Sequence, residues 1–208
     1  MSSKIDLNNK LTPPDRIAEA ALDDPQLLQE LLNGVMPQSQ KSARRENCSQ
    51  ALMFMAEAWP ETLLPHWDHF IQLCQSKNGF SKYVAVYVIA SLTGANPALF
   101  EKDFEKYFAL LDDESVMVAS HAAWNSARIA RACPALAGRI TQELLQIDSS
   151  HHDASHLALV KAYIVEALTD LYPTSTMQPQ IMKFVQDQLN SQSPKTVKLA
   201  KAFLKKFG

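Results

Sequence analysis

The chain has 208 residues, of which 47% are hydrophobic and 20% are charged, enough for one domain with a sizeable core. Twenty Lys and Arg against 22 Asp and Glu give a net charge of −2, so the chain lacks the broad positive field that drives nucleic-acid binding by counterion release. Its five glycines are too few for the turns of a typical sandwich or barrel.

The cysteines and the N-terminal residues bear on location. Cys48, Cys74 and Cys133 lie far apart in segments expected to be helical, which is typical of reduced thiols and not of a disulfide framework or a zinc site. The sequence MSSKIDLNNKLTPPDR lacks the apolar stretch of a signal peptide. No apolar run approaches the roughly 20 residues that span a bilayer. We therefore expect a cytoplasmic protein without a membrane partner.

In chain order, residues 1–13 are expected to be disordered or extended, and about 14–35 to form a helical cap. Prolines then mark a repeat: Pro25, Pro60, Pro97, Pro134 and Pro173 are 35, 37, 37 and 39 residues apart by subtraction of their numbers. Because proline has no N–H, it suits the first turn of a helix, where that donor would have no partner. Each of these prolines is therefore predicted to end one helix and open the next. In the fifth unit, Pro179 restores the pattern six residues late.

Two classes of helix alternate along this interval. Residues 60–76, 97–111 and 134–147 have the i, i+3, i+4, i+7 hydrophobic pattern of amphipathic helices. Residues 42–59, 81–94, 115–133 and 155–172 are richer in small side chains, which allow helices to approach closely on both flanks. The helices 177–190 and 194–207 form a closing pair. The β-branched segment VAVYVIA (84–90) suits a strand by composition, but its place in the repeat favours a helix.

A family resemblance follows from this repeat. Arg44-Arg45, Ala51-Leu52 and Pro60 are placed as in the second helix and following turn of a HEAT unit, and the chain resembles HEAT or armadillo-type repeats over nearly its whole length. The resemblance implies an all-α fold, a right-handed α-α superhelix (a HEAT-like solenoid) of about five helix pairs forming one domain over 1–208. It also implies a curved inner surface, which such proteins use mainly to hold other proteins.

Equal offsets from the prolines predict where a partner binds. Gln50, Tyr87, Trp124 and Tyr163 stand ten residues before Pro60, Pro97, Pro134 and Pro173. Together with Asn47, His121, Asn125 and Arg128, they are predicted to form a ladder on the inner helices that binds a protein or peptide. Aromatic residues with polar tips, and arginine, commonly carry binding energy at interfaces. The alternative is that the aromatic rings only fill space between repeats.

Three other clusters contain residues that could carry a function. His152 and His156, in the segment His151–His156, could hold a metal ion, but the pattern is more typical of a solvated loop leading into a helix. His66, Asp68 and His69 in the sequence HWDHF have no nucleophile beside them and indicate a surface face. The C-terminal lysines, at 195, 198, 201, 205 and 206, fit an amphipathic terminal helix, with binding of an acidic partner or nucleic acid as the alternative.

The repeat therefore predicts a non-enzymatic protein-binding scaffold or adaptor, with no cofactor and no metal, and the absence of a GxGxxG, P-loop, HExxH or GxSxG motif is consistent with it. The alternative is nucleic-acid binding, or an enzyme like the bacterial alkylpurine DNA glycosylases. These resemble the chain in size and HEAT-like architecture and use an inner-face Trp, Asp and Arg on a basic surface. Trp124 and Arg128 match this pattern, but no acid lies among the ladder residues and the net charge is negative. A third reading is a small molecule held between repeats.

Overall fold

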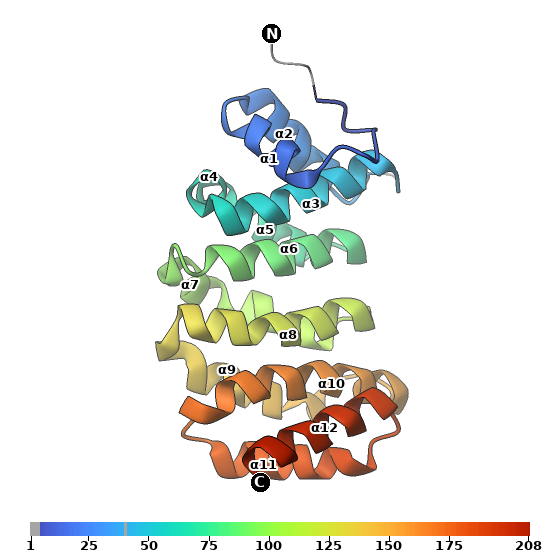
Figure 1. The fold of residues 1–208 in the computed structure, drawn as a ribbon, viewed down its shortest axis with the longest axis vertical. Coiled ribbons are helices and arrows are strands. Elements are labelled where there is room, and N and C mark those ends of the chain that lie inside the picture. The colour runs from blue at the N-terminus through green and yellow to red at the C-terminus, as the bar shows by residue number, and fades with distance from the viewer. Residues whose placement is uncertain (1–4, 40) are drawn as a thin grey trace. The chain divides into compact units, whose positions relative to one another are not determined.

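A computed structural model describes residues 5–39 and 41–208, and in these residues the regular structure is entirely helical. The α-helices are α1 (Pro14–Leu22), α2 (Pro25–Gly34), α3 (Ala43–Ala58), α4 (Pro60–Leu63), α5 (Trp67–Cys74), α6 (Gly79–Leu92), α7 (Pro97–Phe108), α8 (Val116–Ala132), α9 (Ala137–Leu145), α10 (Ala154–Leu171), α11 (Gln178–Asp187) and α12 (Pro194–Phe207), coloured along the chain in Figure 1. Short 3-10 turns follow or precede several of them. The all-α prediction is confirmed.

The prolines begin helices as predicted, with one exception. Pro25, Pro60 and Pro97 are the first residues of α2, α4 and α7, and Pro134 opens the 3-10 turn that leads into α9. Pro173 instead lies in a 3-10 turn, Tyr172–Thr174, and α11 begins only at Gln178, with Pro179 as its second residue. The fifth interval therefore carries a longer connection than the others, as the displaced Pro179 indicates.

Helix α6 contains the β-branched segment that composition alone assigns to a strand. Val84 and Val88 are four residues apart and share one side of this helix, whereas Val86 points to another side. All three are buried, so the helix packs on more than one side. A strand would require a neighbouring strand to pair its backbone, whereas a helix satisfies its own backbone hydrogen bonds. Asn78 begins the helix by accepting a hydrogen bond from the Ser81 amide at 3.1 Å.

The chain divides into two compact units, one ending at Asn96 and the other beginning at Pro97. In the first unit, α3 packs against α1, α2 and α6, and α5 packs against α6. The contact between α2 and α3 is especially close, because a Cβ built on Gly34 would lie 2.3 Å from the Cys48 Sγ. Small side chains at this crossing allow the two helices to approach.

The described part of the N-terminal segment differs from the prediction of a disordered or extended chain; residues 1–4 lie outside the described residues. Residues 5–13 form turns, with the Asn9 and Thr12 amides donating to the Asp6 and Asn9 carbonyl oxygens, both at 3.2 Å. Leu7 is buried. The Asn47 side chain of α3 donates to the carbonyl oxygens of Leu7 and Asn9, each at 2.9 Å. A distant helix thus fixes a segment that has no helical pattern of its own.

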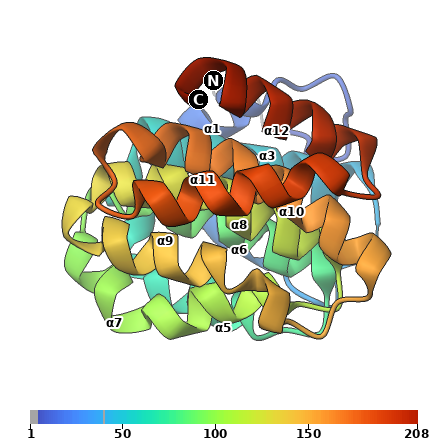
Figure 2. The same cartoon turned by 90° about the horizontal axis from the view of Figure 1, so that it is seen from below.

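In the second unit, α10 lies between α8 and α12 and packs against both. Figure 2 shows α7 and α9 on the opposite side of this unit from α12. The core of this unit is rich in aromatic rings from α7, where Phe104 and Phe108 have centroids 4.4 Å apart. The Thr196 hydroxyl, fully buried, donates to the Ala158 carbonyl oxygen at 2.5 Å and ties α12 to α10.

None of the helices within residues 5–39 and 41–208 is both long enough and apolar enough to cross a lipid bilayer.

Candidate functional site

The predicted ladder residues fall in both units, and the structure places three of them in the first. Asn47 and Gln50 lie on α3, and Tyr87 lies on α6, half-buried, with its ring centroid 5.0 Å from that of Tyr83. The Asn47 side chain is 5% exposed, and its amide nitrogen is used to hold the N-terminal segment. That structural role of Asn47 has no signal in the repeat pattern.

The other five ladder residues lie in the second unit, and four of them meet on one surface. His121, Trp124 and Arg128 share a face of α8 with Met117, because positions i, i+4, i+7 and i+11 fall on one side of a helix. Leu159 and Tyr163 lie similarly on α10. The His121 and Tyr163 rings have centroids 5.6 Å apart and join the two helices. We call this set, Met117, His121, Trp124, Arg128, Leu159 and Tyr163, the α8–α10 face.

Asn125 does not belong to this face, which corrects the prediction. It is 1% exposed, and its Nδ2 donates to the His121 carbonyl oxygen at 2.9 Å within the same helix. One residue beyond Trp124 on a helix is a rotation of about 100°, which turns the side chain from the surface into the core. Among the described residues its Oδ1 has no hydrogen-bond partner.

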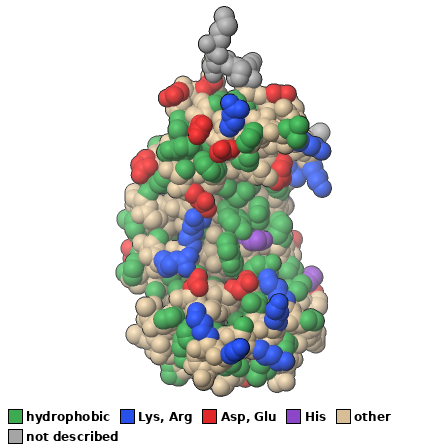
Figure 3. Space-filling model, in the orientation of Figure 1, with side chains coloured by type: hydrophobic (Ala, Val, Ile, Leu, Met, Phe, Trp, Pro, Cys, Tyr) green, Lys and Arg blue, Asp and Glu red, His purple; other side chains and the backbone are tan. Residues whose placement is uncertain are grey.

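Three large hydrophobic side chains of the α8–α10 face are exposed. Met117 and Trp124 are each 45% exposed, and Leu159 is 43% exposed. Figure 3 shows the molecule from the side on which α8, α10 and α12 lie, with hydrophobic side chains exposed among both kinds of charged side chain. Exposed apolar side chains with a charged border are typical of surfaces that bind other molecules.

Helix α12 contributes a charge to the edge of this face. The Lys195 Nζ lies 3.5 Å from the centroid of the Tyr163 ring and 3.8 Å from the Glu166 Oε2. Burial lowers the pKa of His121, and the positive charge of Lys195 lowers it further. His121 is therefore a neutral imidazole at neutral pH, and the face gains no positive charge from it.

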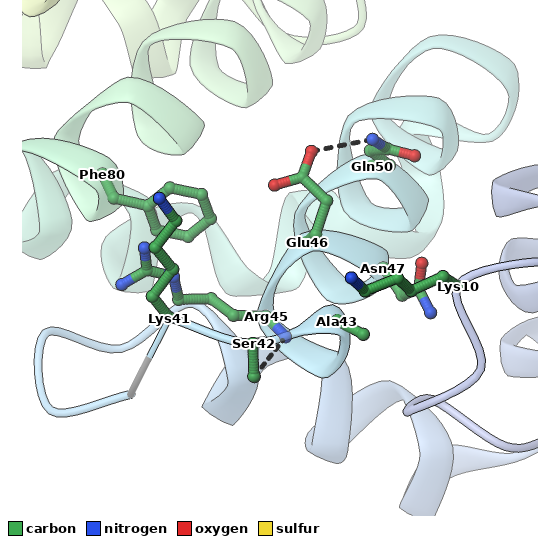
Figure 4. A pocket seen from close by; sticks show the side chains of 9 residues that line it. All are labelled: Lys10, Lys41, Ser42, Ala43, Arg45, Glu46, Asn47, Gln50 and Phe80. Atoms are coloured by element: carbon green, nitrogen blue, oxygen red, sulfur yellow. Dashed lines mark hydrogen bonds between the residues drawn. The ribbon is translucent and has the colours of Figure 1, made fainter.

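The first unit contains a separate cavity of about 710 Å³, shown in Figure 4. We call it the Arg45 cavity; its lining residues are Lys10, Lys41, Ser42, Ala43, Arg45, Glu46, Asn47, Gln50 and Phe80. It includes two ladder residues, Asn47 and Gln50. Lys10 and Lys41 come from loops, so counting equal offsets from the prolines could not have found them.

Arg45 has a fixed position at one side of this cavity. Its guanidinium carbon lies 4.1 Å from the centroid of the Phe80 ring, and its Nη1 donates to the Ser39 carbonyl oxygen at 3.3 Å. The Gln50 Nε2 donates to the Glu46 Oε1 at 2.8 Å. In Figure 4, Lys41 and Arg45 lie on the side of Phe80, and Lys10 lies on the side of Asn47.

The histidines at 151–156 hold loops together. The His151 imidazole pairs with the Asp112 carboxylate, and its backbone amide donates to the Asp112 Oδ1 at 2.6 Å. The His152 Nε2 lies 2.8 Å from the Leu111 carbonyl oxygen, while the His156 Nδ1 lies 3.1 Å from the Asp153 Oδ2. The three rings thus have different partners. No group of three or more His, Cys, Asp or Glu within 5–39 and 41–208 is arranged to hold a metal ion.

In HWDHF, His66 is the last residue of the 3-10 turn before α5, and His69 lies in the first turn of α5. His69 is half-buried with its ring centroid 5.3 Å from that of Phe70, and its Nε2 has no hydrogen-bond partner in the described residues. Burial lowers the pKa of His69, and the neighbouring His66 lowers it further. This arrangement leaves a neutral imidazole in a largely apolar setting.

Comparison with protein-family models matches no family to this chain, and a search of curated proteins also finds no match.

Proposed function

We propose that the chain is a non-enzymatic protein-binding scaffold, a right-handed α-α superhelix of HEAT-like repeats that holds a protein or peptide on its inner helices. The observation that carries the proposal is the exposure of Met117, Trp124 and Leu159 on the α8–α10 face. Full burial of a large apolar side chain is worth about 1.5–3 kcal/mol, and these side chains, 43–45% exposed, forgo somewhat less than half of that each. A partner that covers the face recovers that free energy.

The composition of the face supports a protein partner. Trp, Tyr, Met and Arg are the residue types enriched in the cores of protein interfaces, and Trp124, Tyr163, Met117 and Arg128 supply one of each. All six residues of the face lie on two long helices that pack directly against each other. A partner thus meets a preorganised surface and avoids the entropy cost of ordering a loop.

The face also has a charged border. Arg131 of α8 pairs with Asp170 of α10 at 2.8 Å and closes the border beyond Arg128. Lys195 and Glu166 form the border toward α12. An apolar centre with a charged rim excludes water from the centre while the rim fixes the orientation of the bound segment.

The test compares matched variants in affinity capture from cell lysate, with photo-crosslinking to show direct contact. A Trp124→Ala, Leu159→Ser variant should lose the proteins that the wild-type chain captures. The control is Leu189→Ser, which replaces another exposed hydrophobic side chain of the same unit outside the face. Loss with the face variant and retention with the control is the expected result. Capture of the same proteins by all three chains would refute the proposed site.

A further inference from the structure

The Arg45 cavity collects positive charge in a unit that is negative as a whole. The first 96 residues contain eight Lys and Arg against ten Asp and Glu. Three of those eight cations, Lys10, Lys41 and Arg45, line this one cavity, and Glu46 is the only acid among its described lining residues. They come from three places in the chain: the segment before α1, the residues before α3, and α3 itself. The fold therefore brings like charges together from separate segments.

The charges in the cavity are poorly compensated from within. Within the described residues, Lys10 and Lys41 have no acidic partner, and one carboxylate oxygen of Glu46 accepts the Gln50 amide at 2.8 Å. The neighbouring Arg44 differs, because it pairs with Glu30 at 2.7 Å. Like charges around a hollow raise the local positive potential, which favours an anion over water in that position.

The cavity also has an aromatic ring in its wall and an arginine held in a fixed position. Phe80 carries the Arg45 guanidinium on its face, so this cation is held in place while the other guanidinium donors stay available. Gln50 lines the opposite part together with Asn47, whose Nδ2 already donates to the Leu7 and Asn9 carbonyl oxygens. A volume of about 710 Å³ is within the range of about 300–1,000 Å³ found for small-ligand sites.

We propose that the Arg45 cavity binds an oxyanion, a phosphate or carboxylate group, carried by a ligand whose apolar part rests against Phe80. Arg45 supplies a forked pair of donors to the oxyanion, Lys41 supplies a point charge from the same side, and Lys10 supplies one from the side of Asn47. This site lies in the first unit and does not depend on the proposed α8–α10 face, which belongs to the second.

The experiment titrates the full chain with inorganic phosphate, phenyl phosphate and a pentaglutamate peptide, using calorimetry and amide chemical shifts. The variants are Lys10→Gln, Arg45→Gln and, as the control, Lys77→Gln, an exposed lysine of the same unit outside the cavity. Losing one charge-assisted contact should weaken binding by about tenfold, whereas the control should stay within about twofold of the wild type. Lys10 is exposed without a partner among the described residues, so its replacement keeps the fold.

The three probes separate the sources of the oxyanion. Tighter binding of phenyl phosphate than of inorganic phosphate, lost in Phe80→Leu, supports a phosphate-bearing ligand with an apolar part. Saturable binding of pentaglutamate alone supports the acidic side chains of a protein segment. The proposal is overturned if no probe binds saturably, or if Lys77→Gln weakens binding as much as Lys10→Gln does.

Discussion

At the scale of single residues, two glycines in helices have opposite surroundings. Gly34 ends α2 against Cys48, whose Sγ and Cβ would lie 2.3 and 2.7 Å from an added Cβ. Gly138, in the first turn of α9, has nothing within 4 Å of that position. Glycine in a helix costs about 0.5–1 kcal/mol relative to alanine because its unfolded backbone is freer. Replacing each glycine by alanine therefore separates two effects on stability: at Gly34 the added methyl group also meets Cys48, whereas at Gly138 only the backbone entropy changes.

We expect Gly34→Ala to destabilise the protein by about 1–3 kcal/mol, because the added methyl group must displace buried Cys48 or separate α2 from α3. Gly138→Ala should instead stabilise it by about 0.5–1 kcal/mol. Urea unfolding followed by circular dichroism measures both. Equal effects of the two substitutions would show that the α2–α3 contact is looser than the structure describes.

His69 makes stability depend on pH. Burial, assisted by His66, lowers its pKa in the folded protein below the ordinary value of 6.5, so the unfolded chain binds the proton more tightly. The free energy of unfolding should therefore fall as pH decreases through 6.5 toward the lowered pKa, and His69→Gln should remove part of this slope. Urea unfolding from pH 8 to 5 measures it. Because burial is the main cause, the slope should persist in 1 M salt; its disappearance there would assign the effect to charges instead.

At the scale of elements, sequence periodicity predicted the helices well because proline and hydrophobic spacing act locally. The predicted helix 194–207 agrees with α12 at both ends, where Ser193 caps the helix by accepting from the Thr196 amide and Pro194 is its first residue. Residues 5–13 were missed because a partner distant in sequence, Asn47, determines their structure. Local patterns contain no information about such a contact.

The role of Asn47 gives a prediction for this N-terminal element. Asn47→Ala removes both hydrogen bonds to the carbonyl oxygens of Leu7 and Asn9, which should cost about 1–3 kcal/mol and release residues 5–13 from α3. Hydrogen exchange by mass spectrometry should show faster exchange in peptides that cover this segment. Asn8→Ala, which removes an exposed side chain of the same segment, is the control and should leave the exchange rates unchanged.

At the scale of the whole molecule, the sequence located one candidate surface better than the other. Equal offsets from the prolines found Trp124 and Tyr163, which lie on the α8–α10 face, because corresponding positions on packed helices share a side. The same offsets placed buried Asn125 beside them and could not find Lys10, which comes from a loop outside the repeat. Offsets counted from the prolines compare positions on helices only. The Arg45 cavity is also lined by residues from loops, which such offsets do not reach.

Charge over the whole chain distinguishes the scaffold proposal from nucleic-acid binding. The net charge is −2, and the largest local exception is α12, which carries five lysines and no acid. A single basic helix contacts few phosphates, and each phosphate contact contributes about 0.9 to the slope of log K against log salt on duplex DNA. We therefore expect weak duplex binding at 50 mM salt and none that saturates at 150 mM.

Fluorescence anisotropy with a labelled 20-base-pair duplex at both salt concentrations measures this expectation. Lys198→Gln with Lys201→Gln should abolish the weak binding at 50 mM, because no acid within the described residues neutralises either lysine. Trp124→Ala should leave that weak binding unchanged. Tight binding at 150 mM that is lost with Trp124→Ala or Arg128→Gln would instead place DNA on the α8–α10 face and favour a nucleic-acid enzyme over a protein scaffold.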